Sequence, residues 1–207
     1  MTATERRESY GERGLTPVDR FGVWLSSRAI ERHVSLGSST RVLDIGCGYE
    51  ATLLRSLSGR FAGGTGVDLH VSEAAQREPR LEFIESSIEE ALPTIRAESM
   101  DVVFAISVLE HLKEPEEALR HCNRVLASDG ALVVNVPTWR GKRFLELSAF
   151  RLGLSPAVEM DDHKMYYDKR DLWPLLVRAG FRPRGIKLRY HKFGLNLFAV
   201  ARKLPAG

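Results

Sequence analysis

The chain has 207 residues, of which 43% are hydrophobic and 28% charged, and its formal net charge is +3. This length and composition suit one soluble domain with a full core. No apolar stretch reaches the roughly 18 residues of a membrane helix, and the start is polar, so we expect neither a membrane anchor nor a signal peptide. The modest positive charge is compatible with anionic substrates and does not demand nucleic acid. Two cysteines without C-x-x-C pairing, Cys47 and Cys122, favour free thiols in a reducing cytoplasm.

Residues 1–40 are predicted to form an arm and a helix ahead of the first strand. The first fifteen or so residues are polar and charged, which indicates a mobile arm. Thr16 and Asp19 predict the start of a helix, in which apolar residues follow at helical spacing: Phe21, Trp24, Leu25 and Ala29. This helix would cover the sheet or close over a bound ligand as a lid.

The sequence RVLDIGCGYE, at positions 41–50, predicts a strand, a tight glycine turn and then a helix. Gly46 and Gly48 permit backbone angles that a Cβ resists and let a ligand approach bare backbone. Their spacing also fits a dinucleotide-binding turn, with Asp68 further along to hold a ribose. Asp44 favours a different ligand, because a carboxylate beside the turn repels a pyrophosphate and attracts a cation such as S-adenosylmethionine. A plain connection without a ligand is the remaining alternative.

Alternating strands and helices continue after the glycine turn. Helical patterns alternate with apolar runs, and the run at 100–106 is nearly continuous, as in a central parallel strand covered on both faces. This alternation predicts an α/β fold with a doubly wound parallel sheet. The further strands are expected at 61–68, 81–84, 100–106 and 131–136, and the helices at 51–57, 72–79 and 114–126.

Four ordered segments resemble successive motifs of the class I S-adenosylmethionine-dependent methyltransferases: VLDIGCGYE, GVDLH, DVVFAISVLEHL and RVLASDGALVVNVP. The resemblance implies a Rossmann-like sheet of seven strands in a single domain, mostly parallel with one antiparallel strand. Segments 181–190 and 196–202 fit its closing hairpin. The resemblance also implies S-adenosylmethionine as the cofactor and S-adenosylhomocysteine as its product.

The resemblance further implies which residues bind the cofactor. Asp68 would accept hydrogen bonds from the ribose diol, with Leu69 beside the adenine. Ser87 replaces the acid that usually meets the adenine amino group, so that contact would be uncharged. Glu50 replaces a common third glycine, and its side chain must point away from the cofactor or reach its amino-acid end. The expected cofactor-binding set is Asp44, Gly46, Cys47, Gly48, Asp68, Leu69, Ser87, Ile88 and Ile106.

Residues 41–207 would form the methyltransferase domain, in which 138–165 interrupt the α/β rhythm as a substrate-binding insert. This insert contains aromatic residues, a basic cluster and the sequence EMDDHKMYY. Asp161, Asp162 and His163 could be a solvated loop, a general base with an orienting acid, or a divalent-metal site. Two carboxylates and one imidazole are too few ligands to predict a metal site.

The predicted chemistry is an in-line methyl transfer, in which the protein aligns the acceptor and excludes water. An oxygen acceptor must also lose a proton, and histidine suits this role near neutral pH. His163 is the first candidate for the base and His111 the second. The segment SVLEHL after Ile106 lacks the Asn/Asp-Pro-Pro-aromatic motif of enzymes that methylate adenine nitrogen or glutamine. These two substrates are therefore not expected, and nucleic acid in general is an unlikely partner.

The expected acceptor is a small molecule, methylated on an oxygen of a sugar or another metabolite. Seven cations between 170 and 192 mark either a solvated face or a surface for an anionic or glycosylated acceptor. Quinones, lipids and nucleic acids are alternative acceptors. A nonenzymatic module of the same fold and a nicotinamide-dependent oxidoreductase are the alternative classes. The sequence predicts no particular oligomeric state.

Overall fold

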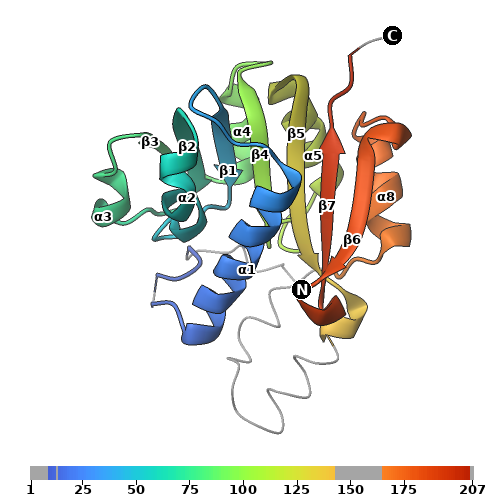
Figure 1. Ribbon diagram of the computed structural model, residues 1–207, viewed down its shortest axis with the longest axis horizontal. Coiled ribbons are helices and arrows are strands. Elements are labelled where there is room, and N and C mark those ends of the chain that lie inside the picture. The colour runs from blue at the N-terminus through green and yellow to red at the C-terminus, as the bar shows by residue number, and fades with distance from the viewer. Residues whose placement is uncertain (1–8, 13, 143–164, 206–207) are drawn as a thin grey trace, which may run out of the picture.

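The computed structural model describes residues 9–12, 14–142 and 165–205, and their strands form one seven-stranded sheet (Figure 1). The strand order is β3-β2-β1-β4-β5-β7-β6, and only β7 runs antiparallel to its neighbours. The predicted fold, a mostly parallel sheet with one antiparallel strand, is therefore confirmed. The strands are β1 (Arg41–Ile45), β2 (Gly63–Asp68), β3 (Leu81–Glu85), β4 (Met100–Ile106), β5 (Leu126–Pro137), β6 (Ile186–His191) and β7 (Asn196–Arg202).

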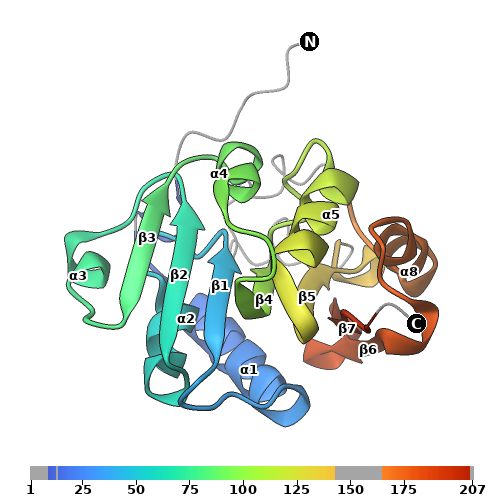
Figure 2. The ribbon, with the colours of Figure 1, turned by 90° about the horizontal axis from the view of Figure 1, so that it is seen from above.

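Helices cover both faces of the sheet (Figure 2). One face packs against α1 (Pro17–His33), α2 (Thr52–Leu57) and the short α3 (Glu73–Gln76). The other packs against α4 (Ile88–Thr94), α5 (Pro115–Val125) and α8 (Lys169–Arg178). The alternation of side chains along a strand divides β4 between two cores, with Val102 and Phe104 on the α1 side and Val103 and Ala105 on the α5 side. This double burial explains the continuous apolar run of β4.

Helix α1 starts where the sequence predicts but buries a different set of side chains. Thr16 and Asp19 form the capping box, in which the Thr16 hydroxyl accepts from the Asp19 amide. Ser26, Ala29 and Ile30 are buried, whereas Phe21 and Trp24 are 53% and 51% exposed. The two rings stack on each other, with centroids 5.7 Å apart. Helical spacing therefore identifies the helix, but only part of the apolar set faces the sheet.

The largest differences between predicted and observed strand boundaries are at the starts of β5 and β6. β5 begins at Leu126 rather than at Ala131, because Leu126 pairs with Met100 ahead of a register shift. β6 begins at Ile186, because residues 183–185 form a 3₁₀ turn.

Among the helices of the described ranges, none is both long and apolar enough to cross a membrane.

Candidate functional site

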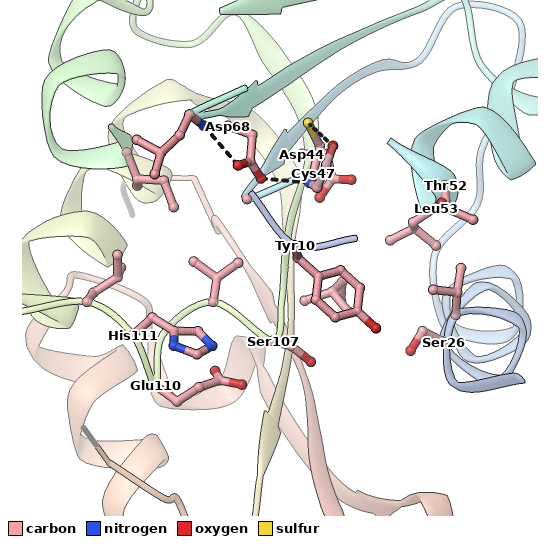
Figure 3. A pocket seen from close by; sticks show the side chains of 18 of the residues that line it. Tyr10, Ser26, Asp44, Cys47, Thr52, Leu53, Asp68, Ser107, Glu110 and His111 are labelled. Atoms are coloured by element: carbon pink, nitrogen blue, oxygen red, sulfur yellow. Dashed lines mark hydrogen bonds between the residues drawn. The ribbon is translucent and has the colours of Figure 1, made fainter. Parts of the chain in front are cut away.

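A cavity of about 1150 Å³ lies beyond the carboxyl ends of β1, β2 and β4 and extends to α1 and the segment between β6 and β7. Ligands of open α/β sheets bind at this edge. The nine residues expected to bind the cofactor all line the cavity, and so does His111. Figure 3 shows Asp44, Cys47 and Asp68 on one side of the cavity and Glu110 and His111 on another.

The glycine turn has the backbone geometry that its sequence predicts. Gly46 and Gly48 have φ values of 68° and 77°, which residues with a Cβ seldom adopt. A Cβ on Gly46 would also collide with the side chain of Val108. The amides of Gly46 and Cys47 donate to the Val67 carbonyl at 2.8 and 3.1 Å, which fixes the turn against β2.

Asp68, at the end of β2, is hydrogen-bonded within the chain (Figure 3). One carboxylate oxygen accepts from the Gly48 amide at 2.7 Å, and the other accepts from the Leu69 amide at 2.8 Å. Each carboxylate oxygen has two acceptor positions, so both retain capacity for a ligand. Asp68 therefore orders the glycine turn, a role that the sequence did not predict.

Asp44 has the most unusual environment of the expected site residues. Its side chain lines the cavity, the residue is 2% exposed, and no hydrogen bond links its carboxylate to another residue in the described parts of the chain. Burial, followed by the nearby Asp68 carboxylate, raises the pKa of Asp44 well above its ordinary value. A cationic group of a ligand would stabilise the ionised form of the Asp44 carboxyl group. This arrangement fits S-adenosylmethionine, which carries an ammonium and a sulfonium.

Cys47, between the two glycines, is buried and contributes a thiol rather than a thiolate. Burial and the negative charges of Asp44 and Asp68 raise the pKa of this thiol far above its usual range. Its sulfur donates weakly to the Gly48 carbonyl at 3.6 Å. The residue is therefore suited to packing in the turn and not to nucleophilic chemistry.

Ser87 and Glu50, the two departures from the family pattern, both have partners in the chain. The Ser87 hydroxyl accepts from the Glu90 amide at 3.2 Å and caps α4. Its hydrogen is still available for a ligand. The Glu50 carboxylate contacts Arg55 at 3.3 Å, and Arg55 also bonds to Glu78. The charge of Glu50 at the cavity wall is thus balanced by a guanidinium.

In the described part of the N-terminal arm, Ser9 and Tyr10 lie against the glycine turn and the end of β2, and the mobility expected of the arm stays a prediction. The Tyr49 amide donates to the Tyr10 carbonyl at 2.8 Å, and the His70 amide donates to the buried Ser9 hydroxyl at 2.7 Å. The Tyr10 ring reaches the cavity (Figure 3). The polar composition of the arm did not indicate these two hydrogen bonds, because bonds to backbone amides leave no periodic pattern in the sequence.

The other end of the cavity, which we call the acceptor end, is formed by α1, the segment after β4 and the segment between β6 and β7. Glu110 is 1% exposed, and both Glu110 and His111 line this end. Lys192 also lines it, a residue that the sequence indicated only as one of many cations. His163, Asp161 and Asp162 lie outside the described residues. Within the described ranges, no group of three or more His, Cys, Asp or Glu side chains could hold a metal ion.

Comparison with known proteins finds similarity over the central part of the chain. Residues 43–134 match a family model described as a methyltransferase domain. A probable S-adenosylmethionine-dependent methyltransferase of Mycobacterium tuberculosis is 28% identical over 178 residues, which cover 83% of this chain and 60% of that protein. A ubiquinone biosynthesis O-methyltransferase of Stutzerimonas stutzeri is 33% identical over 109 residues, covering 49% of this chain and 45% of that protein. This chain therefore matches less than two thirds of the length of either relative.

Solved structures have the same fold. One chain of the complex between the Haloferax volcanii Trm112 methyltransferase activator and a putative methyltransferase superimposes with a TM-score of 0.71. The match covers 90% of this chain and 92% of that one at 12% identity, so it bears on the fold alone. The sequence motifs, the glycine turn at the edge of this sheet and the match over residues 43–134 agree: the central part of the chain is similar to the methyltransferase domain family, and the chain has the same fold as the superimposed structure.

Proposed function

We propose that the protein transfers a methyl group from S-adenosylmethionine to an oxygen atom of a small-molecule acceptor. The observation that carries the proposal is the Asp44 carboxylate, which faces the cavity beside the glycine turn without a hydrogen bond in the described chain. When bound, S-adenosylmethionine supplies an electrophilic methyl group on a cationic sulfur. A buried carboxylate is favourable there because its ligand is positive.

Each expected cofactor residue has a position consistent with its proposed role. Asp44 would face the cationic end of the cofactor, and Asp68 would bind the ribose diol while it holds the glycine turn. The cofactor could approach the backbone of the glycine turn closely, because Gly46 and Gly48 have no side chain and Cys47 is buried. The remaining residues form a partly apolar wall around the adenine: Leu69, Ser87, Ile88 and Ile106.

The chain's contribution to the reaction is to orient the acceptor, exclude water and remove a proton. His111 lines the cavity and is suited to accept the proton of an acceptor hydroxyl near neutral pH. His163 remains the first candidate for the base, on the basis of the sequence alone. Tyr167, which donates its hydroxyl to the Leu109 carbonyl at 3.2 Å, would hold the backbone just before Glu110 and His111.

The N-terminal arm and α1 are proposed to act as a lid over the cofactor. Tyr10 from the arm and Val23 and Ser26 from α1 line the cavity. Deletion of residues 1–14 should weaken binding of S-adenosylhomocysteine, and an unchanged affinity would contradict a role for the arm. We also propose that residues 138–165 complete the acceptor site, since Pro137 and Gly141 line the cavity where this segment begins.

The acceptor is proposed to be a sugar or another metabolite that is anionic or glycosylated. A quinone-like acceptor is the second candidate, because a relative with 33% identity over 109 residues is named as a ubiquinone biosynthesis O-methyltransferase. A sugar and a phenol related to a quinone each offer a hydroxyl group, so the proposed proton removal applies to either. A panel of sugars and phenols, assayed with isotopically labelled S-adenosylmethionine, distinguishes them.

The first test is calorimetric binding of S-adenosylmethionine and S-adenosylhomocysteine to the wild type and to Asp68→Ala. The loss of charge-assisted hydrogen bonds should weaken binding by roughly 1.5–3 kcal/mol, about tenfold to a hundredfold or slightly more. Glu82→Ala removes an exposed carboxylate that lies outside the cavity lining and serves as the control. A wild type that binds neither compound would overturn the proposal.

The second test addresses the proton acceptor. His111→Ala and His163→Ala are compared with the wild type in turnover of an acceptor from the panel. If one histidine is the base, its variant should lose turnover while its affinity for S-adenosylhomocysteine is retained. Near wild-type turnover in both variants would rule out base catalysis by either histidine.

A further inference from the structure

Lys192 carries a positive charge into the acceptor end of the cavity. It follows β6 in the segment that leads to β7, and it lines the cavity together with Gly22 and Ser26 of α1. A Cβ on Gly22 would lie 3.5 Å from the Lys192 Nζ. The ammonium therefore lies against the bare backbone of α1 and is not extended into solvent.

The backbone that carries this lysine is strained and firmly anchored. Lys192, Phe193 and Gly194 have successive φ values of 48°, 60° and 84°, a conformation that is unfavourable for the two residues with a Cβ. The Thr138 amide donates to the Leu195 carbonyl at 2.9 Å, and the Thr138 hydroxyl donates to the Gly194 carbonyl at 2.9 Å. The end of β5 thus holds the segment in a conformation that directs Lys192 toward α1.

The Lys192 ammonium has no close partner in the described parts of the chain, in which no hydrogen bond or ion pair of its Nζ is found. Loss of water around it lowers the pKa of Lys192 to about 8, although Glu110 and Asp19 act in the opposite direction. Burial, followed by the charge of Lys192, lowers the pKa of His191, its neighbour on β6. A poorly hydrated cation without a hydrogen-bond acceptor is unfavourable, and an anionic ligand would relieve this cost.

The charges of the cavity are unevenly distributed. The other lysine of the described lining, Lys113, is exposed. Carboxylates make up most of the charged groups in the lining, so they repel an anion and attract a cationic cofactor over most of the cavity. Lys192 therefore marks the favourable position for an anion. The carboxylates of the described lining are Asp19, Asp44, Glu50, Asp68, Glu85, Glu89, Glu90, Glu110, Glu114 and Glu117.

We propose that Lys192 determines acceptor specificity by binding a carboxylate of the acceptor, which would then be a hydroxylated carboxylic acid. The inference rests on the proposed methyl transfer, because it assigns the acceptor to the end of the cavity opposite the cofactor residues. Val18, Val23 and Leu195 also line this end, so an aromatic ring suits it. Lys192 would hold the acid group while the hydroxyl is aligned for methylation.

The test uses matched acids and amides as probes. The full chain, saturated with S-adenosylhomocysteine, is titrated by calorimetry with 4-hydroxybenzoate and 3,4-dihydroxybenzoate and with the corresponding carboxamides. The wild type should bind at least one acid about tenfold more tightly than its amide, as expected for a charge-assisted hydrogen bond. Lys192→Met should abolish this preference and Lys192→Arg should restore it. Lys113→Met, the control for a general loss of charge, should retain it.

A pH series distinguishes charge recognition from a structural role. The preference for the acid should be greatest well below pH 8, where both Lys192 and the carboxylate of the acid are charged, and it should fall as Lys192 loses its proton at higher pH. S-adenosylhomocysteine should bind equally to all variants. If the wild type fails to bind it, the proposed function itself is wrong. If it binds but no acid is preferred, or if the preference survives in Lys192→Met, the assignment of Lys192 is wrong.

Discussion

Replacement of Asp44 by asparagine should make the empty protein more stable and its cofactor binding weaker. The substitution retains the shape of the side chain but removes a charge that is almost fully desolvated and lies near Asp68. Because the pKa of Asp44 is raised in the folded protein, its ionisation destabilises the fold as pH rises above the unfolded value of about 4. The stability gained by Asp44→Asn should therefore be present at neutral pH and disappear toward pH 4.

Two quantities should change in Asp44→Asn: the Tm of the empty protein and its affinity for the ligand. Each 1 kcal/mol of added stability corresponds to a rise in Tm of roughly 2–4 °C for a domain of this size. The loss of a charge-assisted contact to the ligand ammonium should cost roughly 1.5–3 kcal/mol, or about tenfold to more than a hundredfold in affinity. S-adenosylmethionine and S-adenosylhomocysteine should both be affected, because both carry the ammonium.

Calorimetric titration and thermal unfolding of the same preparations test both effects. Glu50→Gln is the matched control, because Glu50 also lines the cavity but is paired with Arg55 at 3.3 Å. It should change ligand affinity by no more than about 1 kcal/mol. An Asp44→Asn variant that binds both ligands within twofold of the wild type would refute the reasoning, and so would one with a lower Tm.

Three further predictions concern the glycine turn, an ion pair between β1 and β4, and the two cysteines. Gly46→Ala should lose roughly 1–3 kcal/mol in urea unfolding because of its positive φ and the contact with Val108, whereas Gly59→Ala, in open space, should be nearly neutral. Asp101→Asn should lower the free energy of unfolding by at most about 1 kcal/mol. The hydrogen bond with Arg41 lowers the pKa of Asp101, so this loss of stability should be full above pH 4 and should shrink as Asp101 is protonated at lower pH. Burial raises the pKa of Cys122 to about 12 and that of Cys47 still further, so a thiol reagent at pH 8 should modify both only after denaturation.

The sheet was predictable because its signals are local. The continuous apolar run of β4 reflects burial on both faces, and the glycines at 46 and 48 are required by their positive φ values. The capping box of Thr16 and Asp19 likewise spans only four residues. Each of these patterns encodes one element independently of the rest of the chain. Their alternation predicted a doubly wound parallel sheet, whereas the antiparallel closing strand was predicted only from the family resemblance.

The parts of the site that were missed depend on contacts between distant segments. The hydrogen bond from the His70 amide to Ser9 joins residues 61 positions apart. Lys192 reaches the cavity only because β6 and β7 close the sheet and bring their connection against Gly22 of α1. Neither contact has a preferred residue spacing, so periodicity and motif matching could not reveal it. Both become visible only when the packing of α1 and the hairpin is known.

Asp44 and Asp68 can be separated experimentally although both are expected to bind the cofactor. Asp68 accepts hydrogen bonds from the Gly48 and Leu69 amides, so Asp68→Ala leaves two backbone donors without their partner and should lower stability as well as affinity. Asp44 has no such bonds in the described chain, so its neutralisation should lower affinity while stability rises. A loss of binding in Asp68→Ala alone could therefore reflect a disordered glycine turn. Only a loss of binding with gained stability, as expected for Asp44→Asn, isolates the electrostatic attraction between the protein and a cationic ligand.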